Sequence, residues 1–189
     1  MLSLLLVLAE PRILLTVPVA FPDPPLAAAG VVLRRPGADD VPWITAACSD
    51  RELSRYIPGI AYPYSQADAR AFIAHAGQGW AQGTGAAFVI ADAATGDGWG
   101  TIGLHLYPAD AELAEAGYWL RREARGQGAA TTAVRLVSGW AFTKLGIRRL
   151  NLLTAPENAA SQRVAERAGF TGRACCGPGC RPLAADGTA

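Results

Sequence analysis

Seven residues, Arg125-Gly-Gln-Gly-Ala-Ala-Thr131, limit the fold more than any other part of the sequence, because they stand between a strand-like run and an amphipathic helical pattern. The first N–H groups of a helix have no partner inside it, and the helix dipole favours negative charge at that end. Small residues let the backbone approach an anion closely. The loop predicts an anion cradle at a helix start, although an ordinary glycine-rich turn also fits these residues alone.

Two familiar phosphate-binding patterns do not fit this loop. The pattern G-x-x-x-x-G-K-[ST] does not occur in the chain, and the dinucleotide fingerprint needs a third glycine that does not follow Gly126 and Gly128. A nucleotide-binding protein is therefore a weaker reading, in which ATP or NAD would compete for the loop.

The rest of the chain is typical of a mixed α/β (α+β) domain with an antiparallel middle. Strand-like runs alternate with stretches whose apolar residues recur at helical spacing, and the segment Thr95–Gly98 suits a hairpin turn. No internal repeat is visible. The expected strands are 31–34, 86–91, 100–107, 114–120 and 149–154, and the expected helices are 41–48, 66–75, 131–145 and 158–168.

Three motifs, in order and at the expected spacing, resemble the GNAT superfamily of N-acetyltransferases, and within it the RimJ/RimL type. Arg125-x-x-Gly128-x-Ala130 is similar to the family's coenzyme A signature, R/Q-x-x-G-x-G/A. Glu115-Ala-Gly-Tyr-Trp-Leu120 resembles the strand that precedes this signature, and the segment 152–170 resembles the motif that follows it. The resemblance covers residues 31–170 and is weaker upstream of Glu115.

The resemblance implies a GNAT fold, in which a central, twisted, mostly antiparallel sheet is flanked by helices and two central strands are splayed at the coenzyme A site. It implies an N-acetyltransferase that moves an acetyl group from acetyl-CoA, its co-substrate, to a primary amine on a protein N-terminus or a small molecule. No metal is expected to take part. The alternative is a GNAT-like module that binds acetyl-CoA without turnover.

Two residues are expected to be catalytic. Glu115, on the strand beside the loop, is placed to accept the amine proton directly or through a water if burial raises its pKa, with Glu112 as a nearby competitor. A solvated strand-edge glutamate is the plain alternative. The resemblance implies that Ser161 donates a hydrogen bond to the leaving sulfur.

The expected cofactor contacts lie on three segments. By resemblance, a backbone N–H of the strand 118–120 polarises the thioester carbonyl, the loop holds the pyrophosphate, and Asn158 binds the cofactor arm while also being a good helix N-cap. The predicted cofactor-binding residues are Tyr118, Trp119, Leu120, Arg125, Gly126, Gln127, Gly128, Ala129, Ala130, Thr131 and Asn158.

Other chemically versatile side chains carry weaker signals. Neither histidine, His75 or His105, has an acidic partner in sequence, and we expect His105 not to line the acceptor pocket. The aromatic, proline-rich segment 56–64 is the candidate substrate wall, because its prolines prevent regular structure.

The four cysteines match neither a paired C-x-x-C metal layout nor a spread disulfide framework. Cys48 stands alone, and the other three lie together between 175 and 180. This pattern predicts no metal site and fits a reducing, cytoplasmic environment. The formal net charge of +1 favours neither nucleic acid nor an anionic membrane as a partner.

Both ends of the chain are expected to differ from the acetyltransferase domain at 31–170. Residues 1–30 combine an apolar run, too short to span a bilayer, with a proline-rich linker. The tail 171–189 has too few β-formers for the two strands that the family adds there, and we expect it to be disordered. The exposed sheet edge could then pair with the N-terminal run or with a second copy of the chain, as a homodimer.

Overall fold

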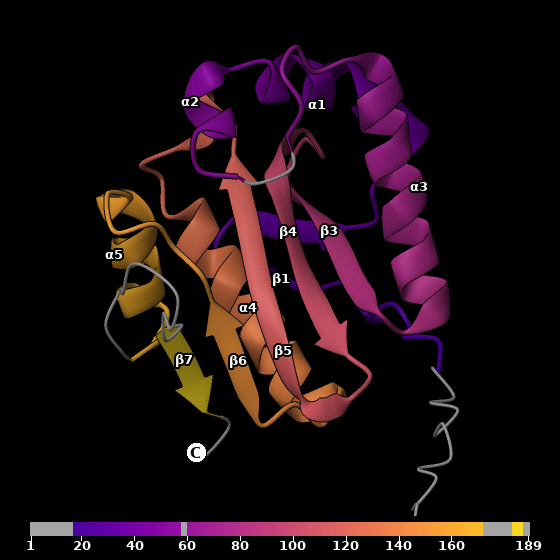
Figure 1. Cartoon of the computed structure of the whole chain (residues 1–189), viewed down its shortest axis with the longest axis vertical. Coiled ribbons are helices and arrows are strands. Elements are labelled where there is room, and N and C mark those ends of the chain that lie inside the picture. Colours follow the sequence, from indigo (N-terminus) through magenta and orange to yellow (C-terminus); the bar gives the residue numbers. More distant parts are fainter. Residues whose placement is uncertain (1–16, 58–59, 172–182, 187–189) are drawn as a thin grey trace, which may run out of the picture.

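The computed structural model describes residues 17–57, 60–171 and 183–186, and in them seven strands form one sheet in the order β1 to β7 (Figure 1). All neighbouring strands are antiparallel except β5 and β6, which are parallel. The strands are β1 (Ala27–Ala28), β2 (Val31–Arg34), β3 (Gly85–Asp92), β4 (Gly98–Tyr107), β5 (Asp110–Leu120), β6 (Arg149–Leu152) and β7 (Leu183–Asp186). The predicted mostly antiparallel sheet is confirmed.

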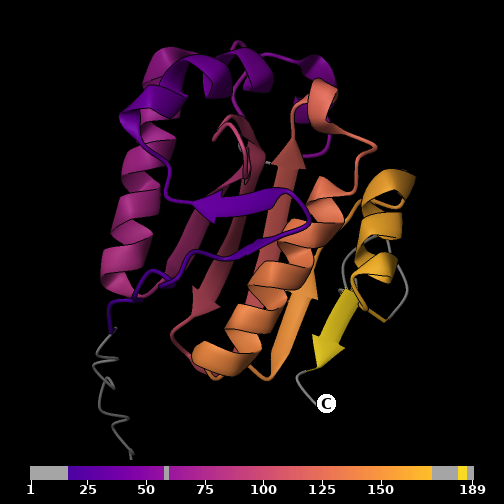
Figure 2. The same ribbon diagram turned by 180° about the vertical axis from the view of Figure 1, so that it is seen from behind.

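Helices cover both faces of this sheet. Figure 1 shows α1, α2 and α3 around the upper end and one side of the sheet, and Figure 2, seen from behind, shows α4 lying along the opposite face. The helices are α1 (Val41–Cys48), α2 (Arg51–Ser54), α3 (Gln66–Gln82), α4 (Ala129–Lys144) and α5 (Ala159–Arg167), with short 3₁₀ turns at Ala38–Asp40 and Arg122–Ala124.

Helix α3 runs one and a half to two turns beyond its predicted end at residue 75. Ser65 and Asp68 form a capping box that fixes its start, and Gly83 in the left-handed region ends it. Ala76, Gly79 and Trp80 are buried along the added turns. Burial of these residues overrides the low helix propensity of the glycines inside the helix.

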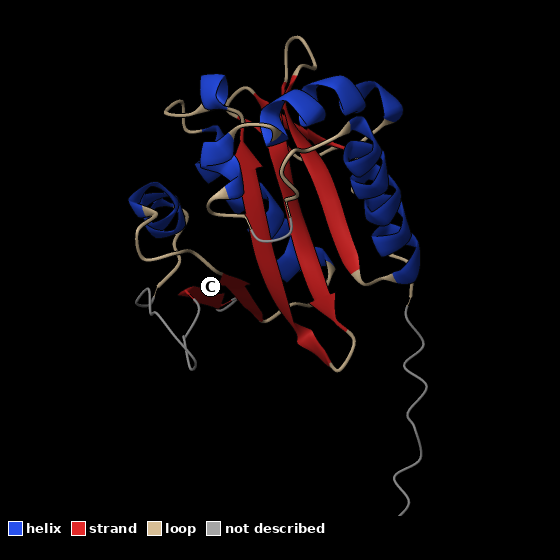
Figure 3. Cartoon of the chain, turned by 45° about the horizontal axis from the view of Figure 1, so that its top comes forward, coloured by secondary structure: helices blue, strands red, loops and turns tan. Residues whose placement is uncertain are grey.

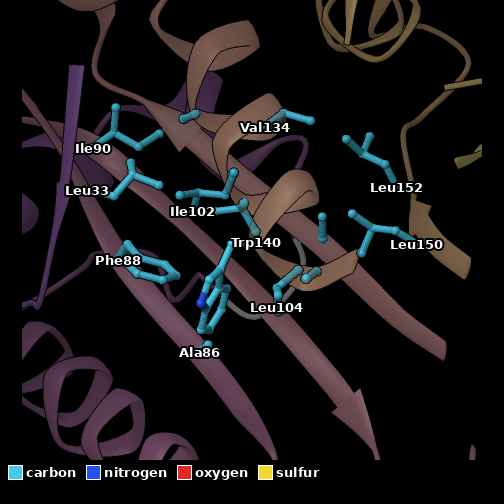
Figure 4. Close-up of a cluster of buried hydrophobic side chains, with 14 of the residues drawn as sticks. Leu33, Ala86, Phe88, Ile90, Ile102, Leu104, Val134, Trp140, Leu150 and Leu152 are labelled. Atoms are coloured by element: carbon cyan, nitrogen blue, oxygen red, sulfur yellow. The ribbon is translucent and has the colours of Figure 1, made fainter. Parts of the chain in front are cut away.

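The main core lies between α4 and one face of the sheet (Figure 4). Trp80, Phe88 and Trp140 form its aromatic centre, with ring centroids 5.1–5.8 Å apart. Around them are apolar side chains from β2, β3, β4, β6 and α4: Leu33, Ala86, Ile90, Ile102, Leu104, Val134, Leu150 and Leu152.

The proline-rich segment before β2 also packs on this core. The ring of Phe21 lies 5.4 Å from that of Trp80, and the Val19 N–H donates to the Trp80 carbonyl at 3.0 Å. The Arg35 guanidinium stacks on both rings, which adds a cation–π contact. The chain from Val19 onward therefore contributes to the domain, although residues 17–26 form no helix or strand. Residues 1–16, including most of the apolar run, lie outside the described residues.

The prediction of a wholly unstructured tail is wrong for residues 183–186. These four residues form β7, which pairs antiparallel with β6. The prediction relied on the few β-formers in the segment, but backbone pairing along β6 depends on register more than on side-chain type. Residues 172–182 and 187–189 lie outside the described residues.

Strands β5 and β6 separate before β5 ends. Their register runs from Leu113 opposite Arg149 to Ala116 opposite Leu152, where β6 stops while β5 continues to Leu120. Because β5 pairs with β4 along this whole stretch, alternate residues such as Tyr118 direct their backbone groups toward the gap. The predicted splay of two central strands is confirmed.

None of the helices in the described part of the chain combines the length and apolar composition that a bilayer crossing needs.

Candidate functional site

A cavity of about 1120 Å³ lies at the gap between β5 and β6, and residues from both sides of the sheet line it. Helices α1 to α3 bound it on one side, β4 and β5 form its floor, and α4 and α5 bound it on the other. The loop between α2 and α3 adds Tyr56, Ile57, Ile60, Ala61 and Tyr64 to the first side. Figure 3 shows β4 and β5 side by side, with α1 and α3 on the side of the sheet that carries this part of the cavity wall. The predicted site residues in its wall are Glu115, Tyr118, Trp119, Leu120, Arg125, Gly126, Ala130, Asn158 and Ser161.

The other four predicted residues lie beside the cavity in the loop and first turn of α4. Gln127 donates from its side chain to the Glu123 carbonyl at 3.0 Å, whereas Gly128 is the N-cap of α4 and Ala129 to Thr131 are its first turn. No side chain caps this helix start. Gly126 and Gly128 have φ angles of +79° and +83°, a region that glycine adopts without strain. The loop thus leaves the first N–H groups of α4 available to an anion.

Arg125 connects the loop to the helices above it. Its Nη1 lies 3.0 Å from Glu52 Oε2, and its Nε donates to the Leu120 carbonyl at 3.2 Å. The neighbouring Arg122 pairs with Asp50 and Glu52 of the same turn. These contacts fix the position of the loop relative to α2, so the Arg125 guanidinium is largely engaged within the protein.

Tyr118, Ser161 and Asn158 form a hydrogen-bonded group at the splayed strands. The Tyr118 hydroxyl donates to Ser161 Oγ at 3.1 Å, and Asn158 Oδ1 accepts from the Ser161 N–H at 3.0 Å. Burial raises the pKa of Tyr118, and the hydrogen bond to Ser161 offsets part of this effect. Asn158 is the N-cap of α5, as predicted. Because the Tyr118 hydroxyl gives its single hydrogen to Ser161, the Ser161 hydroxyl is the one left to donate into the cavity.

Glu115 is the carboxylate that β5 presents to the cavity. Tyr107 donates its hydroxyl to Glu115 Oε2 at 3.2 Å and stacks edge-on against His105, which lies directly opposite Glu115 on β4. Burial and the Glu115 carboxylate raise the pKa of Tyr107, which keeps its hydroxyl a donor. The competing Glu112 is exposed and lies 3.7 Å from Arg148. Glu115 is therefore better placed than Glu112 to act on a bound molecule.

The expectation about His105 is wrong, because this side chain lines the cavity. The expectation considered only acidic residues close to His105 in the sequence. The neighbouring carboxylate, Glu115, lies on the next strand instead. The two-residue alternation of β4, applied to the register with β5, would have found it. The predicted substrate wall does contribute Tyr56 and Tyr64 to the lining.

Two residues with chemical interest were missed by the sequence analysis. Tyr107 supports Glu115, and Thr101, a buried residue of β4, faces the cavity. The alternation along β4 was again the available signal, since Thr101, His105 and Tyr107 share one face.

No group of three or more His, Cys, Asp or Glu side chains is placed to hold a metal ion within residues 17–57, 60–171 and 183–186. Cys48 is a buried free thiol, and burial raises its pKa to about 12. A thiol with so high a pKa is a poor nucleophile at neutral pH. The polar groups that the described residues present at this site are carboxylates, imidazoles, hydroxyl groups and backbone N–H groups.

A family model described as "Acetyltransferase (GNAT) domain" matches residues 31–171. The chain is also 38% identical over 71 residues to YdaF of Bacillus subtilis (strain 168), whose name assigns it by inference to the ribosomal N-acetyltransferases. That match covers 38% of this chain and 39% of YdaF, so the aligned part spans about two fifths of the relative.

Solved structures of similar fold extend over most of the chain. An acetyltransferase from Agrobacterium tumefaciens str. C58 has 26% identity and a TM-score of 0.68, covering 88% of this chain and 95% of its own. RimL, a ribosomal L7/L12 α-N-protein acetyltransferase determined with coenzyme A, has 21% identity and a TM-score of 0.73, covering 84% of this chain and 95% of its own.

Proposed function

We propose that this chain, which belongs to the GNAT family of acetyltransferases, transfers the acetyl group of acetyl-CoA to a primary amine. The observation that carries the proposal is one continuous cavity that joins the anion cradle at α4 to the group of Tyr118 and Ser161 and to Glu115. An elongated thioester with a pyrophosphate at one end suits such a cavity. The amine would enter from the face covered by α1 to α3.

The protein supplies binding and orientation for the cofactor. The N–H groups at the start of α4 would hold the pyrophosphate, with the helix dipole favouring its charge. The backbone groups of Tyr118 and Leu120 that face the gap would pair with the pantetheine arm and polarise the thioester carbonyl. Acetyl-CoA supplies an activated acyl group with a thiolate as leaving group.

Glu115 would take the proton from the attacking amine. In the transfer, the amine nitrogen forms a bond to the acyl carbon, the carbon–sulfur bond breaks, and the sulfur leaves with the electron pair. Ser161, held by its bonds to Tyr118 and Asn158, would stabilise this thiolate by donating a hydrogen bond. Tyr107 would keep the Glu115 carboxylate oriented.

The acceptor class is a primary amine on a protein N-terminus or on a small molecule. The similarity to YdaF and RimL, both named for ribosomal protein acetylation, supports the first. A free, buried Cys48 fits a reducing, cytoplasmic compartment. The pairing of β7 with β6 weakens the alternative of a binding module with an incomplete sheet.

Cofactor binding is tested with a matched pair of variants at the N-cap of α4. Asn and Asp have the same shape and both tolerate the left-handed conformation of Gly128, but Asp adds a negative charge to the cradle. Calorimetry should show that Gly128→Asp binds acetyl-CoA at least tenfold more weakly than Gly128→Asn. Equal affinity of the two variants would contradict the proposed pyrophosphate site.

Turnover is tested by thiol release from acetyl-CoA with a broad amine panel that includes peptides. The double variant Glu115→Gln and Ser161→Ala should lose about a hundredfold or more in rate while keeping acetyl-CoA affinity. Acetyl-CoA binding with a wild-type rate no higher than that of this variant would favour the module instead. Loss of affinity in the variant would show that these residues bind the cofactor rather than act on the reacting atoms.

A further inference from the structure

The cavity floor beside Glu115 consists of three directly opposed residue pairs on β4 and β5. His105 faces Glu115, Gly103 faces Gly117, and Thr101 faces Trp119. Opposed residues in an antiparallel pair share one face of the sheet, and all six line the cavity. The floor therefore has a polar end, a bare middle and a second end with one hydroxyl and one aromatic ring.

The bare middle is open space rather than tightly packed backbone. A Cβ added at Gly117 would meet nothing within 4 Å, and one at Gly103 would meet Ala86 O at 3.6 Å, an ordinary contact. Neither glycine has a positive φ. Folding therefore does not require glycine at either position, although a strand interior normally disfavours it.

Thr101 gives the far end of the floor an unused polar group. The residue is 5% exposed as a whole, and its hydroxyl makes no hydrogen bond within the described residues. The buried side-chain atoms without a partner in the described residues are Arg121 Nε and Asn151 Oδ1, so the Thr101 hydroxyl is instead accessible from the cavity that the residue lines. Its place in the cavity wall means that a bound molecule could be its partner.

The wall above the floor is apolar. Ile44, Cys48 and Leu53 are buried there, and Tyr64, Phe72 and Trp119 pack against them while lining the cavity. The acidic residues in this part of the wall are already engaged, since Glu52 pairs with Arg122 and Arg125 and Asp68 caps α3. A molecule above the floor would contact apolar surface between two polar ends.

Resting on the proposed function, we propose that the acceptor is a primary amine on a flat, apolar body, which lies on Gly103 and Gly117 with its nitrogen at Glu115 and a polar group at Thr101. The pair of His105 and Glu115 and the pair of Thr101 and Trp119 are four residues apart along the strands, which corresponds to roughly 13 Å. Two hydrogen bonds of about 2.8 Å leave roughly 8 Å between the nitrogen and the far polar atom. An aromatic ring with a two-carbon amine arm and a hydroxyl opposite matches this length.

The test compares three amines that differ in one feature each. Tyramine has the ring and the hydroxyl, phenethylamine has the ring alone, and ethylamine has neither. Wild-type protein should acetylate tyramine with the highest kcat/KM. Thr101→Val, which removes the hydroxyl and keeps the shape, should raise the KM for tyramine about fivefold and leave that for phenethylamine unchanged.

The glycine floor is tested with Gly103→Val. This variant should raise the KM for both aromatic amines at least tenfold and change that for ethylamine less than twofold, with unaltered acetyl-CoA affinity. Gly139→Val is the control, because Gly139 is an exposed glycine of α4 far from the floor, and its added Cβ would meet nothing within 4 Å while that at Gly103 makes only ordinary contacts.

Equal effects of Gly103→Val on all three amines, or a wild-type preference for ethylamine over tyramine, would overturn the inference and leave the proposed function intact. Absence of thiol release with every amine of the broad panel would instead refute the proposed function itself. A gain in thermal stability of Thr101→Val without any change in KM would also count against the role of the hydroxyl.

Discussion

The two faces of strands β4 and β5 differ sharply, although each face is formed by every second residue of the same two strands. On the α4 side, Ile102, Leu104, Ala114 and Ala116 are at most 4% exposed and belong to the main core (Figure 4). On the other side, the alternate positions from Thr101 to His105 and from Glu115 to Trp119 line the cavity. One face carries the apolar side chains of the main core, of which Ile102, Leu104 and Ala116 also border the cavity, and the other face carries polar residues, an aromatic ring and glycines.

Fold and chemistry therefore depend mainly on separate sets of residues in these strands. Side chains on successive strand positions point to opposite faces, so a chain can keep an apolar core on one face while varying the other. Substitutions on the α4 face should change stability with little effect on selectivity. Substitutions on the cavity face should do the reverse.

The largest effect is expected in the aromatic centre of the core. Phe88 is fully buried and contacts the rings of Phe21, Trp80 and Trp140. Phe88→Ala should lower the free energy of unfolding by about 4 kcal/mol, because it removes buried surface and leaves a void. Urea unfolding measures this loss, with Phe88→Leu as the milder control.

Folded Phe88→Ala protein should retain the wild-type order of preference among acceptor amines. A changed order would break the separation between the two faces, since Phe88 does not line the cavity.

A smaller loss of stability is expected when the hydrogen bonds to Asp40 are weakened. Asp40 accepts bonds from Arg34 Nη2 at 2.7 Å, Trp43 Nε1 at 2.7 Å and the Gly37 N–H at 2.8 Å, and so ties the start of α1 to β2. Asp40→Asn should lower the free energy of unfolding by about 2 kcal/mol, because charge-assisted bonds are lost.

The same network makes stability depend on pH. Burial alone would raise the pKa of Asp40, but the bonds from Arg34, Trp43 and Gly37 outweigh it and hold the pKa below its ordinary value of 3.8. A carboxyl with a lowered folded pKa adds stability above its unfolded pKa and loses it as pH falls further. Wild-type stability should therefore decline below about pH 4, and unfolding of Asp40→Asn should show a flatter decline. Parallel curves for the two proteins would contradict this assignment.

Most of the fold was predictable because it follows from local periodicity. The apolar runs of β3 to β5, the helical stripe of α4 and the loop at Arg125 each specify their element without reference to distant residues. The strand β7 could not be predicted, because its four residues carry no strong β signal and the strand depends on pairing with β6.

The candidate site was predictable in its motifs but not in its cross-strand contacts. Glu115, Asn158 and Ser161 were found because they stand in or beside a recognisable motif. Tyr107, His105 and Thr101 come from β4 and meet the site through the register with β5, which a single sequence does not specify. Their apolar neighbours in the sequence made them resemble ordinary strand positions.

The smallest effect, and the sharpest comparison of the faces, is expected on β6. Asn151 is buried on the cavity side beside Glu115, and its Oδ1 has no hydrogen-bond partner among the described residues. Asn151→Leu keeps the volume and removes the unpaired group, so stability should stay the same or rise by up to about 1 kcal/mol. The reverse swap at the next residue, Leu150→Asn, places a polar group in the α4 core and should cost roughly 2–3 kcal/mol. Thermal unfolding of both variants decides the matter. A loss of stability in Asn151→Leu comparable with that of Leu150→Asn would mean that Asn151 is bonded within the fold, and that the two faces of β6 are equally intolerant of change.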